Sequence, residues 1–256
     1  RKWPIMSKPL TLLWAGPCTR TPGWNCKTDR LIYVKSLTLY LRGGAFFVGA
    51  GQMARVDDYF NAKKIAVKTL SAYALDEITA CTEFEATDEG FRLSFLTRTY
   101  RVSFPDFEFV DENDADAEVP IQEQVLILHY MSAMEKKPVS GKWIAYREIP
   151  GAAFYYSSFV KRAIDPLKKV FGHNTAGLPR AADKIGGTAI DNGDVGYEFR
   201  VLPKVPLQLI LWEGDDEFAP EANILFDDTA GSYLSPEDAA WLAGMLVYRL
   251  IALSKA

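Results

Sequence analysis

The sequence predicts an α+β fold in which antiparallel strand pairs pack with a few buried helices in a single domain. Segments that alternate between apolar and polar residues follow one another in pairs, separated by short turns rich in Gly, Pro and Asp. Segments with helical periodicity come in clusters, whereas a parallel α/β fold would alternate single strands with single helices. With 256 residues, 48% of them apolar, the chain is long enough to bury a substantial core.

The first part of the domain is expected to hold one helix and a strand meander. Apolar residues recur at helical spacing over 56–73, which predicts an amphipathic helix. Residues 78–86 alternate loosely, 88–90 form an Asp-Glu-Gly turn, and 91–104 alternate well. This pattern predicts two or three antiparallel strands. The stretch from Pro105 to Pro120 contains seven acids and is expected to be an exposed connection.

The middle of the chain predicts two helices around a strand. Residues 120–134 begin with Pro and are nearly apolar from 125 to 131, so we expect a buried helix. Residues 142–149 read as a strand that ends at the Pro150-Gly151 turn. Residues 157–171 have one apolar and one basic face, which predicts a helix, and Pro166 is expected to split it.

The last part of the chain predicts strands followed by a central helix. A short helix is expected over 178–185. Residues 195–202 and 205–213 read as strands joined by a Pro-Lys turn, and 222–226 read as a third strand. The sequence Ser-Pro-Glu-Asp then starts a helix over 236–253, because it offers a capping hydroxyl, a Pro in the first turn and an acid three residues later. This helix is almost entirely apolar and is expected to be buried.

Residues 1–52 differ in composition from the rest of the chain. They carry eight Lys or Arg against one acid, whereas residues 53–256 carry 21 against 32. They lack a clear period, and they fit a secretory signal or a transit peptide poorly. A genuine N-terminal segment is one interpretation. The favoured one is a non-native or disordered extension from a misassigned start, with Met53 as the initiator and 53–256 as the domain.

Composition excludes several classes of function. The cysteines Cys18, Cys26 and Cys81 match no zinc or iron–sulfur spacing, and their small number suits a reducing compartment, which predicts a cytoplasmic protein. No apolar run is long enough for a membrane-spanning helix. The negative charge of residues 53–256 disfavours nucleic-acid binding, which needs a basic surface. Among the few histidines, His129 lies between apolar neighbours and is expected to be a core residue.

The stretch 207–228 places many carboxylates after an apolar strand. Its acids include Glu213, Asp215, Asp216 and Glu217, and Asp227 and Asp228 follow at its end. Converging carboxylates could bind a divalent cation or perform acid/base chemistry. The spacing matches no fixed metal-binding loop, so a solvated loop that pairs with basic residues of 157–171 is the alternative.

A second candidate site lies where the 142–149 strand ends. Arg147 and Glu148 precede the Pro-Gly turn, and Tyr155 and Tyr156 follow it. Arg147 could clamp a carboxylate or phosphate, with the tyrosines as a stacking wall. The alternative is a structural Arg–Glu pair over a packed aromatic cluster.

Three stretches carry a resemblance to a known family: LILHYMSAMEKKPVSGKWIAYREIPGAAFYYSSFVKRAIDPLKKVFG, GGTAIDNGDVGYEF, and VPLQLILWEGDDEFAPEANILFDDTAGSYLSPEDAAWLAGMLVYRL. In them the chain resembles DUF3786, a domain of unknown function from anaerobic bacteria and archaea. The resemblance covers about 120–250 well, 53–110 more weakly, and none of 1–52. It implies that some relatives carry an added iron–sulfur domain. This chain lacks the cysteines for one, so an iron–sulfur or corrinoid-type group would belong to a partner protein.

These observations lead to two hypotheses of function. The first is a cytoplasmic binding or accessory domain of an anaerobe that serves a redox or one-carbon cofactor system. Its ligand surface would combine Arg147, Glu148 and the Tyr155/Tyr156 wall, facing the acids of 213–221. The alternative is a divalent-metal-dependent hydrolase that uses Asp215, Asp216 and Glu217. The resemblance brings no catalytic residues, and the sequence identifies no cofactor.

Overall fold

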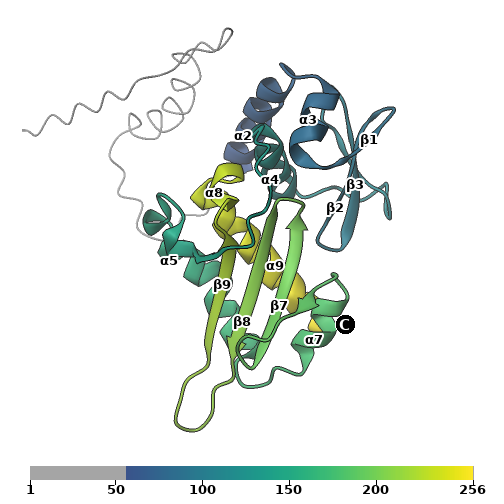
Figure 1. Ribbon diagram of the computed structural model, residues 1–256. Coiled ribbons are helices and arrows are strands. Elements are labelled where there is room, and N and C mark those ends of the chain that lie inside the picture. The colour runs from purple at the N-terminus through teal and green to yellow at the C-terminus, as the bar shows by residue number, and fades with distance from the viewer. Residues whose placement is uncertain (1–55, 256) are drawn as a thin grey trace, which may run out of the picture. The chain divides into compact units, whose positions relative to one another are not determined.

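Two antiparallel sheets and a set of helices form the computed structural model, which describes residues 56–255 (Figure 1). The first sheet has the order β1-β2-β3-β4, with strands β1 (Glu85–Thr87), β2 (Gly90–Phe95), β3 (Arg98–Ser103) and β4 (Phe109–Asp111). The second has the order β5-β9-β8-β7-β6, with strands β5 (Trp143–Ala145), β6 (Thr188–Ala189), β7 (Val195–Leu202), β8 (Val205–Trp212) and β9 (Glu221–Asp227). Antiparallel pairing throughout, together with the helices, confirms the α+β fold class.

The predicted meander forms the centre of the first sheet. Strand β2 pairs with β3 from Gly90 opposite Ser103 to Phe95 opposite Arg98. Burial alternates along β2, with Phe91 and Phe95 fully buried and the intervening polar side chains exposed. The alternation that predicted these strands is therefore the pattern of one face on the core and one face toward solvent.

The predicted strand over 78–86 is only partly correct, because residues 78–82 belong to helix α3 (Leu75–Thr82) and only 85 and 86 belong to strand β1. The Glu77 carboxylate accepts a hydrogen bond from the Ala74 N–H at 2.9 Å, which satisfies a free donor at the helix start. Ile78 and Cys81, three residues apart, are both buried on one face of this helix. Their spacing resembles the loose alternation of a strand, which explains the wrong part of the prediction. Cys81 is a small buried residue of this helix.

The acidic stretch after Pro105 also contains a strand, which we did not predict. Strand β4 (Phe109–Asp111) pairs with β3, and Asp111 is only 5% exposed. Its carboxylate lies 3.6 Å from the Arg98 guanidinium. This buried ion pair explains how an acidic segment joins the sheet, because the charge has a partner inside the protein.

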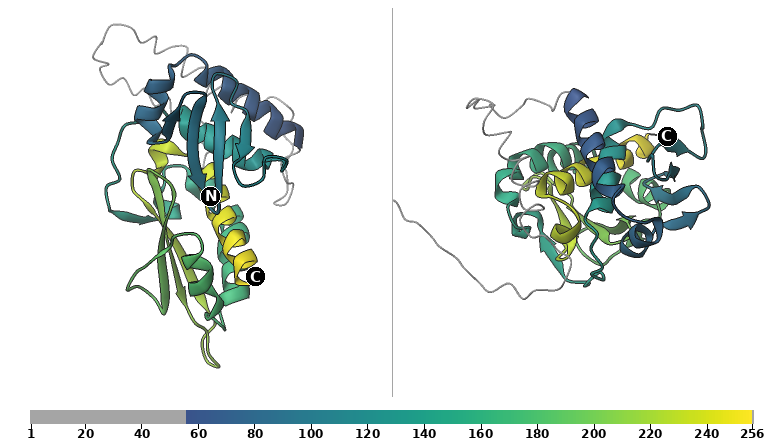
Figure 2. Two further views of the ribbon diagram at one scale, coloured as in Figure 1. Left: turned by 90° about the vertical axis from the view of Figure 1, so that its right-hand side faces the viewer. Right: turned by 90° about the horizontal axis from the view of Figure 1, so that it is seen from above.

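The long predicted helices are present and lie against the sheets. Helix α2 (Val56–Leu70) packs on α4 (Ile121–Ser132), and α9 (Pro236–Ser254) contacts α4 and most helices of the second half. Figure 2 shows α9, in yellow, on one face of the second sheet. The Ser235 hydroxyl accepts a hydrogen bond from the Asp238 N–H at 3.2 Å, as the Ser-Pro-Glu-Asp pattern predicts.

The segment around Pro166 changes helix type without a break. It consists of α5 (Tyr156–Phe159), the π-helix η3 (Val160–Ile164) and α6 (Asp165–Phe171). Asp165 donates its N–H to the Val160 carbonyl, five residues earlier. Proline has no N–H to donate to a preceding carbonyl, and the wider turn accommodates this loss. The prediction of a division at Pro166 is thus correct in place and wrong in form.

The predicted strand over 142–149 is shorter than expected. Only Trp143–Ala145 pairs with β9, and the chain then forms the 3₁₀ turns η1 (Tyr146–Glu148) and η2 (Ala152–Phe154). Helices α7 (Gly177–Asp183) and α8 (Ala230–Tyr233) complete the described elements. No helix within residues 56–255 is both long and apolar enough to cross a membrane. The interpretation of residues 1–52 and of Met53 as the start concerns a segment outside the described residues.

Candidate functional site

Arg147 lies on the 3₁₀ turn η1, directly after β5. Its guanidinium carbon is 3.6 Å from the centroid of the Tyr156 ring, which is a close cation–π contact. The side chain is exposed, and it forms no hydrogen bond or ion pair with any residue in the described part of the chain. Its planar group is therefore held in place while its N–H donors remain available to another molecule.

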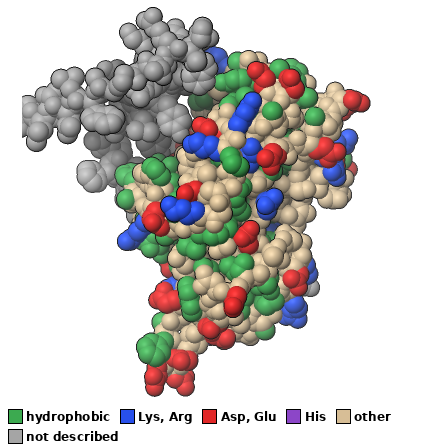
Figure 3. Space-filling view, viewed as in Figure 1, with side chains coloured by type: hydrophobic (Ala, Val, Ile, Leu, Met, Phe, Trp, Pro, Cys, Tyr) green, Lys and Arg blue, Asp and Glu red, His purple; other side chains and the backbone are tan. Residues whose placement is uncertain are grey.

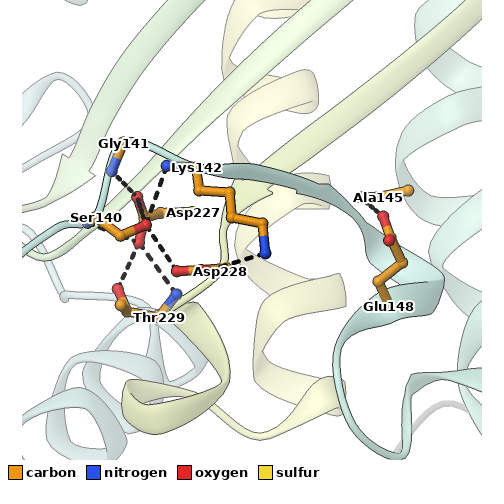
Figure 4. Close-up of polar contacts among 8 residues, drawn as sticks. All are labelled: Ser140, Gly141, Lys142, Ala145, Glu148, Asp227, Asp228 and Thr229. Atoms are coloured by element: carbon orange, nitrogen blue, oxygen red, sulfur yellow. Dashed lines mark hydrogen bonds and ion pairs between the residues drawn. The ribbon is translucent and has the colours of Figure 1, made fainter.

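Glu148 does not neutralise Arg147. Its carboxylate accepts a hydrogen bond from the Ala145 N–H at 2.7 Å, across the turn that it belongs to (Figure 4). This bond takes the Ala145 donor, which helps to explain why the strand ends there. Arg147 and Glu148 form no ion pair with each other among residues 58–255. The alternative interpretation of these two residues, a structural Arg–Glu pair, is therefore wrong.

The aromatic residues after the Pro-Gly turn extend this surface. Phe154 is 84% exposed, and its ring lies 5.1 Å from the Tyr155 ring in an edge-to-face arrangement. The Tyr155 hydroxyl hydrogen-bonds the Glu237 carboxylate in the first turn of α9. We call Arg147, Phe154, Tyr155 and Tyr156 the arginine–aromatic surface.

Tyr146 anchors the arginine–aromatic surface to the core. It is 1% exposed, and its ring stacks on Phe159 with a centroid distance of 4.2 Å and an interplanar angle of 2°. Its hydroxyl donates to the Pro236 carbonyl at 2.7 Å. Desolvation by burial is the main cause that raises the pKa of Tyr146, so this hydroxyl keeps its proton.

The acids of 213–217 lie on the connection between β8 and β9, where Figure 3 shows Asp and Glu side chains gathered at the end of the hairpin. The Asp215 carboxylate accepts hydrogen bonds from the N–H groups of Glu217 at 2.8 Å and Phe218 at 2.7 Å. These backbone bonds, the one from Phe218 first, lower the pKa of Asp215. Glu213 and Asp216 are exposed, and no acid of this connection pairs with a basic residue of 157–171 among the described ion pairs.

The structure does not bring the two predicted groups together. The acidic connection extends beyond the end of the second sheet, whereas η1 follows the β5 edge, where Ala145 pairs with Leu225 of β9 (Figure 1). No hydrogen bond, ion pair or ring contact between described residues joins them. The surface that we expected Arg147 and Tyr156 to form with these acids is therefore two separate surfaces.

Asp227 and Asp228 have different environments at the end of β9 (Figure 4). Asp227 is fully buried, and its carboxylate accepts hydrogen bonds from the backbone and side chains of Ser140 and Thr229 and from the Gly141 N–H. Asp228 is exposed, and its carboxylate accepts from the Ser140 hydroxyl at 2.6 Å. Asp227 therefore fastens the loop before β5 to the turn after β9.

The acids considered for a metal site do not converge in the structure. Across residues 58–255, no three or more His, Cys, Asp or Glu side chains form a group that could hold a metal ion. The trio Asp215, Asp216 and Glu217 accordingly does not form such a group. One oxygen of Asp215 is instead occupied by two backbone N–H groups.

A cluster that the sequence did not reveal lies at the first turn of α9. His129 Nδ1 is 3.0 Å from Asp238 Oδ1, and the Ser235 hydroxyl donates to Asp238 Oδ2 at 2.7 Å. Partial burial lowers the pKa of His129, but the hydrogen bond and attraction to Asp238 outweigh it and raise the pKa overall. On the second turn of α9, the Arg162 guanidinium carbon lies 4.4 Å from the Trp241 ring centroid. His129 is thus hydrogen-bonded, as a core histidine is expected to be, but it is half-buried and lies at the edge of the core.

Comparison with known proteins gives one match. A family model described as "Domain of unknown function (DUF3786)" matches residues 74–249. No curated protein and no solved structure matches the chain. The matched segment contains every residue of the arginine–aromatic surface, of the acidic connection and of the α9 cluster.

Proposed function

Because the chain belongs to the DUF3786 family, a domain without an assigned function, we propose its function from the site geometry. The domain is a binding module, and the arginine–aromatic surface docks a partner protein. The observation that carries this proposal is Arg147, which forms no ion pair with residues 58–255 and stacks on Tyr156 near the highly exposed Phe154.

The chemistry of this surface suits a protein interface. Arg and aromatic residues are enriched where a few side chains supply most of the binding energy. Phe154 would enter an apolar pocket of the partner, and the Arg147 guanidinium would bind a carboxylate at the rim of that pocket. The partner is therefore expected to present an apolar depression with acidic residues at its edge.

The anchoring of the surface also supports docking. Arg147 is held by the Tyr156 ring, and the neighbouring Tyr146 is fixed by Phe159 and the Pro236 carbonyl. Ordering a free side chain on binding costs roughly 0.5–1.5 kcal/mol. Side chains that are already ordered avoid part of this cost, so a small surface can bind with useful affinity.

Site-specific photo-crosslinking in the native host tests the proposal. A benzoylphenylalanine in place of Phe154 is expected to form one discrete protein adduct, and Arg147→Glu is expected to abolish it by repelling the acidic rim. The same crosslinker at Tyr248, which is 58% exposed on α9, serves as the matched control and should give no such adduct. Equal adducts from both positions, or an adduct that persists in Arg147→Glu, would contradict the proposal.

The identity of the adduct tests the finer predictions. If the crosslinked partner is an iron–sulfur or corrinoid-type protein, the result supports a role in a redox or one-carbon cofactor system. A partner of another class would contradict that prediction.

The alternative, a divalent-metal-dependent hydrolase, receives no support from the geometry of the acidic connection. It predicts a metal-dependent stabilisation of about 2.7 kcal/mol at a hundredfold excess of Mg²⁺ or Ca²⁺ over its Kd. Thermal unfolding of the wild type and of Asp216→Ala with each ion would detect it, because the effect should vanish in the variant.

A further inference from the structure

A groove runs between the two sheets, away from the arginine–aromatic surface. It consists of two adjoining cavities of about 280 and 130 Å³, which share the lining residues Ser94, Arg200 and Val201. Ser94 belongs to β2 of the first sheet, and the other two belong to β7 of the second. Figure 1 shows β2 and β7 meeting at this junction. Small-molecule sites are concave and occupy roughly 300–1,000 Å³, so only the two adjoining cavities together reach this range.

The floor of this inter-sheet groove is apolar. Its lining includes apolar residues of β2, of β7 and of the segments beside β1, β2 and α7: Phe84, Leu93, Leu96, Ile185, Phe199 and Val201. Phe84, Leu93, Phe199 and Val201 are each less than 9% exposed, so their positions are fixed by core packing. Leu96 and Ile185 are half-buried, so they would supply most of the apolar contact with a bound chain.

The acidic residues at the rim of the groove are already neutralised. Arg92 lies 2.9 Å from Glu112 and 3.1 Å from Glu85. Lys204, whose side chain is only 6% exposed, lies 3.3 Å from Glu83. These pairs leave no uncompensated carboxylate among the described residues that line the groove.

Arg200 is a charged residue of the groove that takes part in none of these ion pairs. It is exposed, it lines both cavities, and it has no hydrogen bond or ion pair with residues 58–255. The β7–β8 pairing is irregular at this point, with a register shift between Arg200 and Leu202. Arg200 lies opposite Pro206, which has no N–H to give the ladder. Such irregularities redirect side chains and are frequent beside binding sites.

We propose that the inter-sheet groove binds a small amphiphilic carboxylate. The Arg200 guanidinium holds the carboxylate with two parallel N–H···O bonds, and the Ser94 hydroxyl lies at the same rim. The apolar tail lies along the floor. One uncompensated cation matches a monoanion, which favours a carboxylate over a doubly charged phosphate.

An NMR titration of the full chain with sodium hexanoate tests this proposal. Saturable shifts are expected at the amides of Ser94 and Val201. 1-Hexanol has a similar tail without the charge, and sodium acetate has the charge without the tail, so each should bind at least tenfold more weakly. Arg200→Gln is expected to weaken hexanoate binding at least tenfold. Arg180→Gln is the matched control, because Arg180 is exposed on α7 and does not line the groove.

A second variant tests the location independently of charge. Ser94→Trp places a bulky ring in the groove from an exposed position and should abolish the saturable shifts while the remaining spectrum stays dispersed. The proposal is overturned if hexanoate leaves Ser94 and Val201 unshifted, or if 1-hexanol binds as tightly as hexanoate. Unchanged hexanoate affinity in Arg200→Gln would overturn it as well.

Discussion

Replacing Asp227 with Asn changes one buried carboxylate at the point where two loops meet. Asp227 is 0% exposed, and its carboxylate accepts five hydrogen bonds from Ser140, Gly141 and Thr229. Oδ1 accepts three of them, including both from Thr229, and Oδ2 accepts from the Gly141 N–H at 2.7 Å. The Asn amide keeps the shape of the side chain and one of its acceptor oxygens.

The expected cost follows from the bonds that Asn cannot accept. Its NH₂ group would face the Gly141 N–H, so this donor loses its partner, and the remaining bonds lose their charge. A hydrogen bond to a charged group contributes about 1.5–3 kcal/mol, so we expect the free energy of unfolding to fall by about 2–3 kcal/mol. Asp228→Asn is the matched control. Its exposed carboxylate lies 3.7 Å from the Lys142 ammonium, and the variant should lose less than about 1 kcal/mol.

Urea unfolding at several pH values measures both variants. Burial raises the pKa of Asp227, but the hydrogen bonds from Thr229, Ser140 and Gly141 outweigh it and lower the pKa overall. A carboxyl with a lowered pKa stabilises the fold above its unfolded pKa of about 3.9, and this contribution is lost as the pH falls through the folded pKa. The difference between the wild type and Asp227→Asn should therefore narrow below about pH 4. Equal losses in the two Asn variants at neutral pH would refute the reasoning.

Four further predictions concern single residues. In an NMR titration, the imidazole of His129 should titrate above its ordinary pKa, and its pKa should return toward that value in Asp238→Asn. The stabilisation by this pair is therefore present below about pH 6.5 and lost as the pH rises through the folded pKa. A titration midpoint that is unchanged in Asp238→Asn would argue against the pair. Gly90→Ala should destabilise the protein by about 3 kcal/mol or more, since its φ is +148° and a Cβ would lie 2.2 Å from the Val102 carbonyl oxygen. Gly141→Ala, at φ +75° in open space, should cost only about 1–2 kcal/mol in the same denaturation assay. Asp215→Ala should speed hydrogen exchange of the two N–H groups that its carboxylate holds and leave the global unfolding midpoint unchanged.

Elements with strong local signals could be predicted from the sequence. The meander at 91–104 alternates because one face of a sheet is buried, and Ser235 starts α9 through contacts within its own first turn. The error at 78–86 has the opposite origin. Its few apolar residues fit a short strand as well as a short helix, and the burial of Ile78 against the rest of the core decides between them.

The candidate site could be predicted only in part. The positions of Arg147 and Tyr156 on either side of a Pro-Gly turn predict a binding surface. The cation–π contact between them depends on the 3₁₀ turns η1 and η2, which reverse the chain. The position of Glu148 next to Arg147 predicted a pair between them. The Glu148 carboxylate instead accepts a hydrogen bond from the Ala145 N–H, at the end of β5. Local sequence therefore names the residues but not their partners.

By itself, the sequence determined the α+β class, the family and the position of most helices and hairpins, because periodicity, capping and turns act between residues close in the chain. Only the tertiary structure decided which polar groups meet. His129 and Asp238 are 109 residues apart, and the groove at Arg200 is lined by strands from two different sheets. The separation of the acidic connection from Arg147 also depends on tertiary structure, since β5 pairs with β9 only at Leu225–Asp227, the end of β9 away from that connection. Contacts of this sort depend on packing across the whole domain, and no spacing within the chain encodes them.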